Sequence, residues 1–127
     1  MKRAAQFVSD TEMPNVRSFD LSLVAMADDE LLEINRASLG HDSLTDVITF
    51  ELERTPDAIE AEVYLSVERA RENARRYRAT LESELLRLVI HAVLHLAGFG
   101  DKSVKDRKQM RNRERWYLVA IQASAHE

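Results

Sequence analysis

The sequence is organised around one stretch, Leu81-Glu-Ser-Glu-Leu-Leu-Arg-Leu-Val-Ile-His-Ala-Val-Leu-His-Leu-Ala-Gly-Phe-Gly-Asp101. Its first part is almost continuously apolar and rich in helix formers, and Thr80 stands before it as a possible N-cap. Gly98 stands where a helix that ends at about Ala97 needs a left-handed residue. The stretch therefore predicts a central apolar helix against which the rest of the chain can pack.

Two histidines on this helix predict a metal site. His91 and His95 are one helical turn apart on the same face, with Cβ atoms roughly 5–6 Å from each other. That separation lets two imidazoles bind one ion at Zn–N distances of about 2.0–2.1 Å. The two glycines that follow let the chain turn back, so that Asp101 can become a third ligand. A hydrogen-bonded pair of structural histidines is the alternative, because two buried imidazoles without partners would be costly.

Length and composition bound the class of protein. At 127 residues the chain is long enough for one domain with a core, so we expect a single domain over residues 1–127. The chain has no cysteine, which excludes disulfides and thiolate metal sites. No apolar run predicts a transmembrane span, and the N-terminus lacks the apolar segment of a secretory signal. We therefore expect a cytoplasmic protein without a membrane partner.

The basic residues are concentrated in the sequence before and after the predicted helix that carries the two histidines. The net charge of −4 argues against a general nucleic-acid binder. Residues 69–78, however, hold five arginines against one acid, and residues 102–115 hold seven basic residues against two acids. These clusters could hold a polyanion near a metal ion, although solvated helix faces would look the same. The candidates for phosphate contacts are Arg69, Lys102 and Lys105.

Hydrophobic patterning predicts an α+β fold in which a small mixed β-sheet is layered against helices. Strands are expected at residues 18–25, 45–52 and 62–66, and helices at about 28–39, 67–77, 81–97 and from 103 onward. Residues 53–60 contain a proline and several acids and are expected to form a loop. Residues 1–17 carry no clear pattern and are expected to form a poorly defined N-terminal arm. The side chains expected to face the core include Tyr77 of the helix at 67–77 and four residues of the last helix, Val104, Met110, Tyr117 and Ile121.

Three blocks of the sequence resemble, in the same order, those of the YbeY family of metal-dependent endoribonucleases, which act in ribosomal RNA maturation. They are Glu33-Ile-Asn-Arg-Ala-Ser-Leu-Gly-His-Asp-Ser-Leu-Thr-Asp-Val-Ile-Thr-Phe50, Glu62-Val-Tyr-Leu-Ser-Val-Glu-Arg-Ala70 and His91-Ala-Val-Leu-His-Leu-Ala-Gly-Phe-Gly-Asp101. The resemblance covers about residues 19–117, which is most of the chain. It implies an α+β layered fold with one zinc ion per chain.

The resemblance also implies a ligand set, with two departures from the family pattern. His91 and His95 match the first two family ligands, and Asp101 replaces the third histidine. Aspartate is a competent zinc ligand, although its charge damps the Lewis acidity of the ion. Leu39 stands where many family members have an arginine that assists RNA cleavage or binding. That role is expected to be absent here or taken by a neighbour, Arg36 or His41.

The function implied by the resemblance is zinc-dependent cleavage of single-stranded RNA. The expected process is maturation of the 3′ end of 16S ribosomal RNA together with ribosome quality control, and the expected partners are ribosomal RNA and the small ribosomal subunit. Three protein ligands leave a position for a metal-bound water, the expected nucleophile, although attack by the RNA 2′-OH is equally allowed. No side chain identifies itself as the general base.

Two other functions compete with this interpretation. The first is a ribosome assembly or binding factor whose metal site is mainly structural. The second is a zinc hydrolase of another class, such as a peptidase. Ala92 counts against a peptidase, because it stands where the HExxH motif carries its catalytic glutamate.

Overall fold

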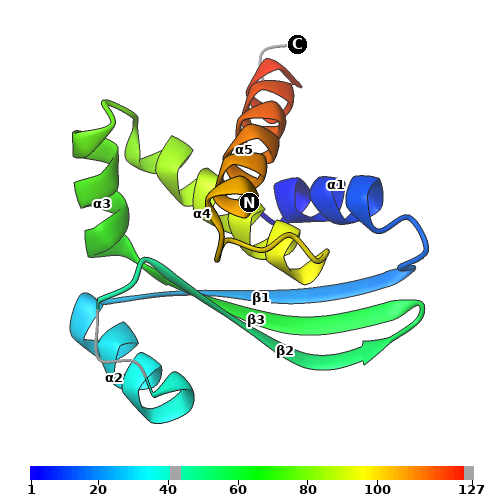
Figure 1. Ribbon diagram of the computed structural model, residues 1–127, viewed down its shortest axis with the longest axis horizontal. Helices are drawn as coiled ribbons and strands as arrows, with labels where there is room; N and C mark the ends of the chain where they lie inside the picture. Colours follow the sequence, from blue (N-terminus) through cyan, green and yellow to red (C-terminus); the bar gives the residue numbers. More distant parts are fainter. Residues whose placement is uncertain (41–43, 125–127) are drawn as a thin grey trace.

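The computed structural model describes residues 1–40 and 44–124 and has the predicted α+β architecture (Figure 1). Its elements are α1 (Lys2–Glu12), β1 (Ser18–Met26), α2 (Asp28–Leu39), β2 (Val47–Thr55), β3 (Ala58–Ser66), α3 (Val67–Arg76), α4 (Leu81–Leu96) and α5 (Val104–Ser124). The sheet is mixed and has the order β1-β3-β2, in which β1 is parallel and β2 antiparallel to β3. The predicted small mixed sheet is therefore confirmed.

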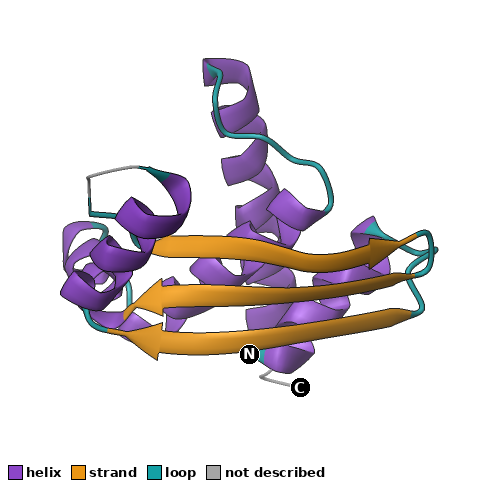
Figure 2. Cartoon of the chain, turned by 90° about the horizontal axis from the view of Figure 1, so that it is seen from below, coloured by secondary structure: helices purple, strands orange, loops and turns teal. Residues whose placement is uncertain are grey.

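Helices cover the two faces of the sheet unequally. Helices α1, α4 and α5 lie on one side of it, whereas α2 lies on the other side, at one end of the strands (Figures 1 and 2). The alternating residues of β3 that face α4 are fully buried, among them Ile59, Ala61 and Val63. Because α4 packs against α1, α3 and α5 as well as against the sheet, it is the central element of the core.

Local capping residues define both ends of α4, as the sequence predicts. The hydroxyl of Thr80 accepts a hydrogen bond from the backbone N–H of Ser83 at 3.0 Å. At the other end, Gly98 has a φ of +103°, and its N–H donates to the carbonyl of His95. Residues that have a side chain rarely adopt this backbone conformation, which explains why position 98 is a glycine. The caps fix where α4 ends and therefore where the chain turns back after the two histidines.

The prediction of a poorly defined N-terminal arm is wrong for most of residues 1–17. Lys2–Glu12 form α1, which packs against α4 and buries Ala4, Ala5 and Val8. The apolar side of this helix consists mainly of small residues, so its hydrophobic periodicity is weak in the sequence. Its stability comes from tertiary packing, which no local pattern reveals.

The prediction of a loop over residues 53–60 is also wrong, because β2 and β3 form a tight hairpin there. β2 continues to Thr55 and pairs with Ala58 at the start of β3. Pro56 and Asp57 form the turn, where proline loses no ladder hydrogen bond and its fixed φ suits the first turn position. The carbonyl of Asp57 accepts hydrogen bonds from Arg17 and Ser18, which ties the turn to the start of β1.

Some of the expected inward-facing residues are exposed instead. Met110 and Tyr117 are buried and Ile121 packs against the core, as predicted. Tyr77 is 66% exposed because α3 ends one residue before it, and Val104 is exposed because it begins α5. Among the described residues, no helix is both long and apolar enough to cross a membrane.

Candidate metal site

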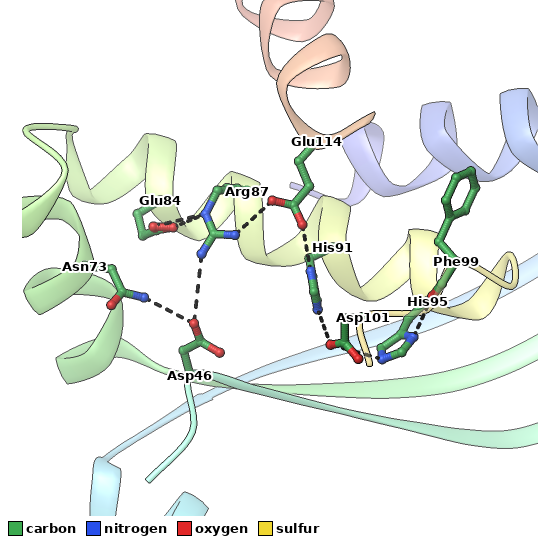
Figure 3. A network of polar contacts seen from close by, with 9 residues as sticks. All are labelled: Asp46, Asn73, Glu84, Arg87, His91, His95, Phe99, Asp101 and Glu114. Atoms are coloured by element: carbon green, nitrogen blue, oxygen red, sulfur yellow. Dashed lines mark hydrogen bonds and ion pairs between the residues drawn. The ribbon is translucent and has the colours of Figure 1, made fainter. Parts of the chain in front are cut away.

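The three predicted ligand residues lie together at the end of α4. Nε2 of His91 is 3.7 Å from Oδ2 of Asp101, and Nε2 of His95 is 3.8 Å from the same oxygen. The ligand atoms of all three residues lie within 4.8 Å of one another. As Figure 3 shows, Asp101 reaches the histidines from the segment that follows the turn at the end of α4. The structure thus brings the predicted set together.

These distances fit a zinc-sized ion. Four ligand atoms in tetrahedral arrangement at about 2.0–2.1 Å from zinc are about 3.3–3.4 Å apart. The two distances to Asp101 exceed this value by about 0.3–0.5 Å. The side chains of His95 and Asp101 are 44% and 42% exposed, so a small rotation is enough to close the group around an ion. The donor set of two imidazoles and a carboxylate is one that zinc accepts.

Hydrogen bonds at the other ring nitrogens orient both imidazoles. Nδ1 of His91 is 2.7 Å from a carboxylate oxygen of Glu114, and Nδ1 of His95 is 2.9 Å from the carbonyl oxygen of Phe99. Because both oxygens can only accept, each Nδ1 carries the proton and donates it. The lone pair of each Nε2 is then available to a metal ion, which is the arrangement typical of metal-binding histidines.

Glu114 belongs to a buried charge network that extends away from the ligands. Its carboxylate, 4% exposed, accepts a hydrogen bond from Nη1 of Arg87 at 2.9 Å (Figure 3). Arg87 also pairs with the buried Glu84 and lies 3.9 Å from the carboxylate of Asp46. Burial raises the pKa of Glu84, although Arg87 opposes this shift. Burial would lower the pKa of Arg87, but its hydrogen bond to Glu84 and the charge of Glu114 raise it overall. Arg87 is therefore held as a cation among carboxylates.

Glu114 and Arg87 are the site residues that sequence reasoning missed. A usable signal was present for Glu114, which lies between Met110 and Tyr117 at helical spacing and so interrupts the buried side of α5. A charged residue at such a position requires a buried partner. The partner itself could not be named, because the pairing joins residues 23 and 27 positions apart in the chain.

The ligands form one wall of an open cavity of about 400 Å³. The rest of the lining comes from α2, from the residues just before β2 and from the start of β2, and it includes Leu39, Thr45 and Asp46. Among the described residues, no lysine or arginine lines this cavity, which we call the metal pocket. With the carboxylates of Asp46 and Asp101 and no cationic side chain, the metal pocket suits a metal ion better than a bare phosphate.

None of the four candidate RNA-binding residues lines the metal pocket. Arg36 is exposed on α2, and Lys102 and Lys105 are exposed just after Asp101. Nε of Arg69 donates at 3.0 Å to Asp28 at the start of α2. The other residue considered for the role of the missing arginine, His41, lies outside the described residues.

The fold and the site together define a class: an α+β protein with an open His-His-Asp centre suited to a divalent metal ion. The family model described as Endoribonuclease YbeY matches residues 1–122. The chain therefore belongs to the YbeY family of endoribonucleases. Because the match includes residues 1–17, α1 is part of the family fold.

Individual relatives agree with this assignment. A relative from Flavobacterium psychrophilum, named Endoribonuclease YbeY, is 44% identical over 95 residues, which are 75% of this chain and 67% of the relative. A second protein of that name, from Chloroherpeton thalassium, is 42% identical over 80% of this chain and 72% of its own length. The solution structure of TM1509 from Thermotoga maritima covers 98% of this chain and 81% of its own, with 30% identity and a TM-score of 0.64.

Proposed function

We propose that the chain is a zinc-dependent endoribonuclease that cleaves single-stranded RNA in ribosomal RNA maturation, with His91, His95 and Asp101 as the metal ligands. The endoribonuclease class and the link to ribosomal RNA processing rest on family membership. Dependence on a metal rests on one observation, the convergence of the three ligand atoms at an open pocket.

Each side chain of the site has a distinct role in this proposal. A bound zinc ion supplies Lewis acidity, which polarises a phosphoryl oxygen and lowers the pKa of water to about 7. Glu114 and the carbonyl of Phe99 hold the two imidazoles in the required orientation. Asp46 faces the ligands across the metal pocket and is held by the side-chain amide of Asn73 at 3.2 Å. It is the candidate to accept the proton of the attacking group.

The two competing functions fit the site less well. A structural zinc site is normally closed by four protein ligands, whereas the described residues supply three ligands at an open pocket. A peptidase of the HExxH type needs a glutamate beside the first histidine. Ala92 occupies that position and is fully buried, so no base can act from there.

The remaining expectations belong to the same proposal. We propose a cytoplasmic protein whose partners are ribosomal RNA and the small ribosomal subunit, to be tested by co-sedimentation with small subunits at low and raised salt. We also propose that residues 1–127 act as one domain. The core cluster supports this, because it takes residues from α1, β1, β3 and the helices α3, α4 and α5, and Val47 of β2 packs against it.

The decisive experiment compares metal content and RNA cleavage in the same preparations. We expect about one zinc per chain, lost in His91→Ala and Asp101→Ala, and loss of cleavage in His95→Ala with the circular dichroism spectrum unchanged. His126→Ala is the control, since it also removes an imidazole but is not one of the proposed ligands. Cleavage at the wild-type rate in folded His95→Ala would refute metal-dependent catalysis at this site.

A further inference from the structure

A second cavity adjoins the metal pocket and has the opposite charge. It has a volume of about 560 Å³ and is lined by Tyr77, Arg87, Arg111, Glu114, Arg115 and Leu118. We propose that this cavity, the arginine groove, binds the backbone of single-stranded RNA next to the phosphodiester that enters the metal pocket. The proposal rests on the proposed function and adds to it the place where the RNA strand is held.

The metal pocket and the arginine groove share a wall. Glu114 lines the groove and also contacts His91, a ligand of the metal pocket, at 2.7 Å. Arg87 lines the groove and lies 3.9 Å from Asp46, which lines the metal pocket (Figure 3). A strand that leaves the metal pocket past Arg87 therefore enters the groove directly.

The groove supplies the cations that the metal pocket lacks. Arg111 and Arg115 are four residues apart on α5, so they project from the same side of the helix one turn apart. Both are exposed, and neither forms an ion pair or hydrogen bond with the described residues. The acid of the groove, Glu114, is already paired with Arg87. Two arginines are therefore available for phosphates, the contacts that dominate affinity for nucleic acids.

The exposed aromatic ring in the groove also fits RNA. Tyr77 is 66% exposed, and the guanidinium of Arg76 lies 5.9 Å from its ring centre. Proteins that bind single strands commonly stack bases on aromatic rings beside arginines. Leu118, which is half-buried, adds apolar surface to the same groove. A base stacked on Tyr77 would cover a large aromatic side chain that the fold leaves in solvent.

The test measures binding of a fluorescent single-stranded 2′-O-methyl RNA oligonucleotide to the zinc-loaded full chain at several salt concentrations, with electrophoresis to verify that the RNA stays intact. Each phosphate contact on single strands contributes about 0.7 to the slope of log K against log salt. Arg111→Ala/Arg115→Ala should therefore reduce the slope by about 1.4. Between 50 and 200 mM salt, the wild type should lose about sevenfold more affinity than this variant.

The matched control is Arg71→Ala/Arg75→Ala, which removes the same charge from α3. Each of these arginines is two positions from Asn73, or about 200° around the helix, and Asn73 faces Asp46. The control should leave affinity and slope close to those of the wild type. Tyr77→Ala should weaken binding about fivefold or more without changing the slope, whereas Tyr77→Phe should bind like the wild type.

Two outcomes would overturn the groove proposal. One is an unchanged salt slope in Arg111→Ala/Arg115→Ala, which would leave the groove to an acidic protein partner. The other is an equal loss of RNA affinity in both double arginine variants, which would attribute the effect to overall charge.

Cleavage of unmodified RNA by the wild type is measured separately. If cleavage persists while either overturning outcome is found, the proposed function stands without the groove. If cleavage is absent while RNA binding depends on Arg111 and Arg115, the proposed function alone fails.

Discussion

Glu114→Gln tests whether the buried carboxylate orients a metal ligand. Glu114 lies 2.7 Å from Nδ1 of His91 and 2.9 Å from Nη1 of Arg87, and it is almost fully buried. Glutamine keeps the shape and can still accept a hydrogen bond from His91, but it removes the charge that holds the ring and makes its Nε2 more basic. The substitution therefore changes the residue that orients His91 and leaves the three ligand residues themselves unchanged.

The expected magnitude follows from these contacts. Loss of a partner that orients a metal-binding histidine typically costs 10–100-fold in metal affinity, or about 1.4–2.8 kcal/mol. Glu114→Gln should lie near the lower end of this range, because one hydrogen bond survives, and Glu114→Ala near the upper end. Glu114→Ala should also lower the free energy of unfolding by about 1–3 kcal/mol. This is less than the 3–5 kcal/mol typical of a broken buried pair, since Arg87 is partly exposed and keeps Glu84 as a partner.

The assay is competition for zinc with a chromophoric chelator, together with urea unfolding in the presence of chelator to measure the stability of the metal-free chain. Glu82→Gln is the control, because it is the same substitution at an exposed position on α4. We expect zinc affinity in the order wild type, Glu114→Gln, Glu114→Ala. If a folded Glu114→Gln binds zinc as tightly as the wild type, then the carboxylate is not what orients His91 for the ion.

Three further predictions concern other parts of the molecule. Burial raises the pKa of Tyr117, and so does its hydrogen bond to Glu12, so the folded chain keeps this phenol protonated. The stability that this contributes should be present below pH 10 and lost above it, so the free energy of unfolding measured with urea should fall above pH 10, and it should fall less in Tyr117→Phe. Val8→Ala should lower the free energy of unfolding by about 1–2 kcal/mol, because Val8 is fully buried on the side of α1 that packs against the core. No change in urea unfolding would contradict the packing of this helix. Leu39→Arg would place a cation at the wall of the metal pocket and should steepen the salt dependence of RNA binding by about 0.7; an unchanged slope would mean that RNA does not reach Leu39.

The metal ligands could be predicted because their arrangement is local in the sequence. His91 and His95 need only one helical turn, and Gly98 provides the left-handed residue that returns the chain toward Asp101. The cap at Thr80 is equally local. Such features depend on backbone geometry over a few residues, which residue type and spacing specify directly.

The features that could not be predicted depend on contacts between distant segments. The apolar side of α1 is made of small residues whose burial depends on α4, and the hairpin at Pro56 depends on the pairing of Thr55 with Ala58. Tyr77 has the spacing of a core residue, yet it is exposed because α3 ends before it. In each case the contact partner or the helix boundary that decides the structure lies in another part of the chain.

The charge network explains why the metal site and its surroundings differ in predictability. The ligands are presented by one turn of α4 and the segment after it, but Glu114, which orients one of them, comes from α5. Arg87 joins that carboxylate to Asp46 on the far side of the metal pocket. Arg87 and Glu114 also separate an acidic cavity, suited to a metal ion, from a basic cavity suited to phosphate. One pair of side chains thus orients a metal-ligand residue and divides the two charge environments that cleavage of a polyanion by a metal ion requires.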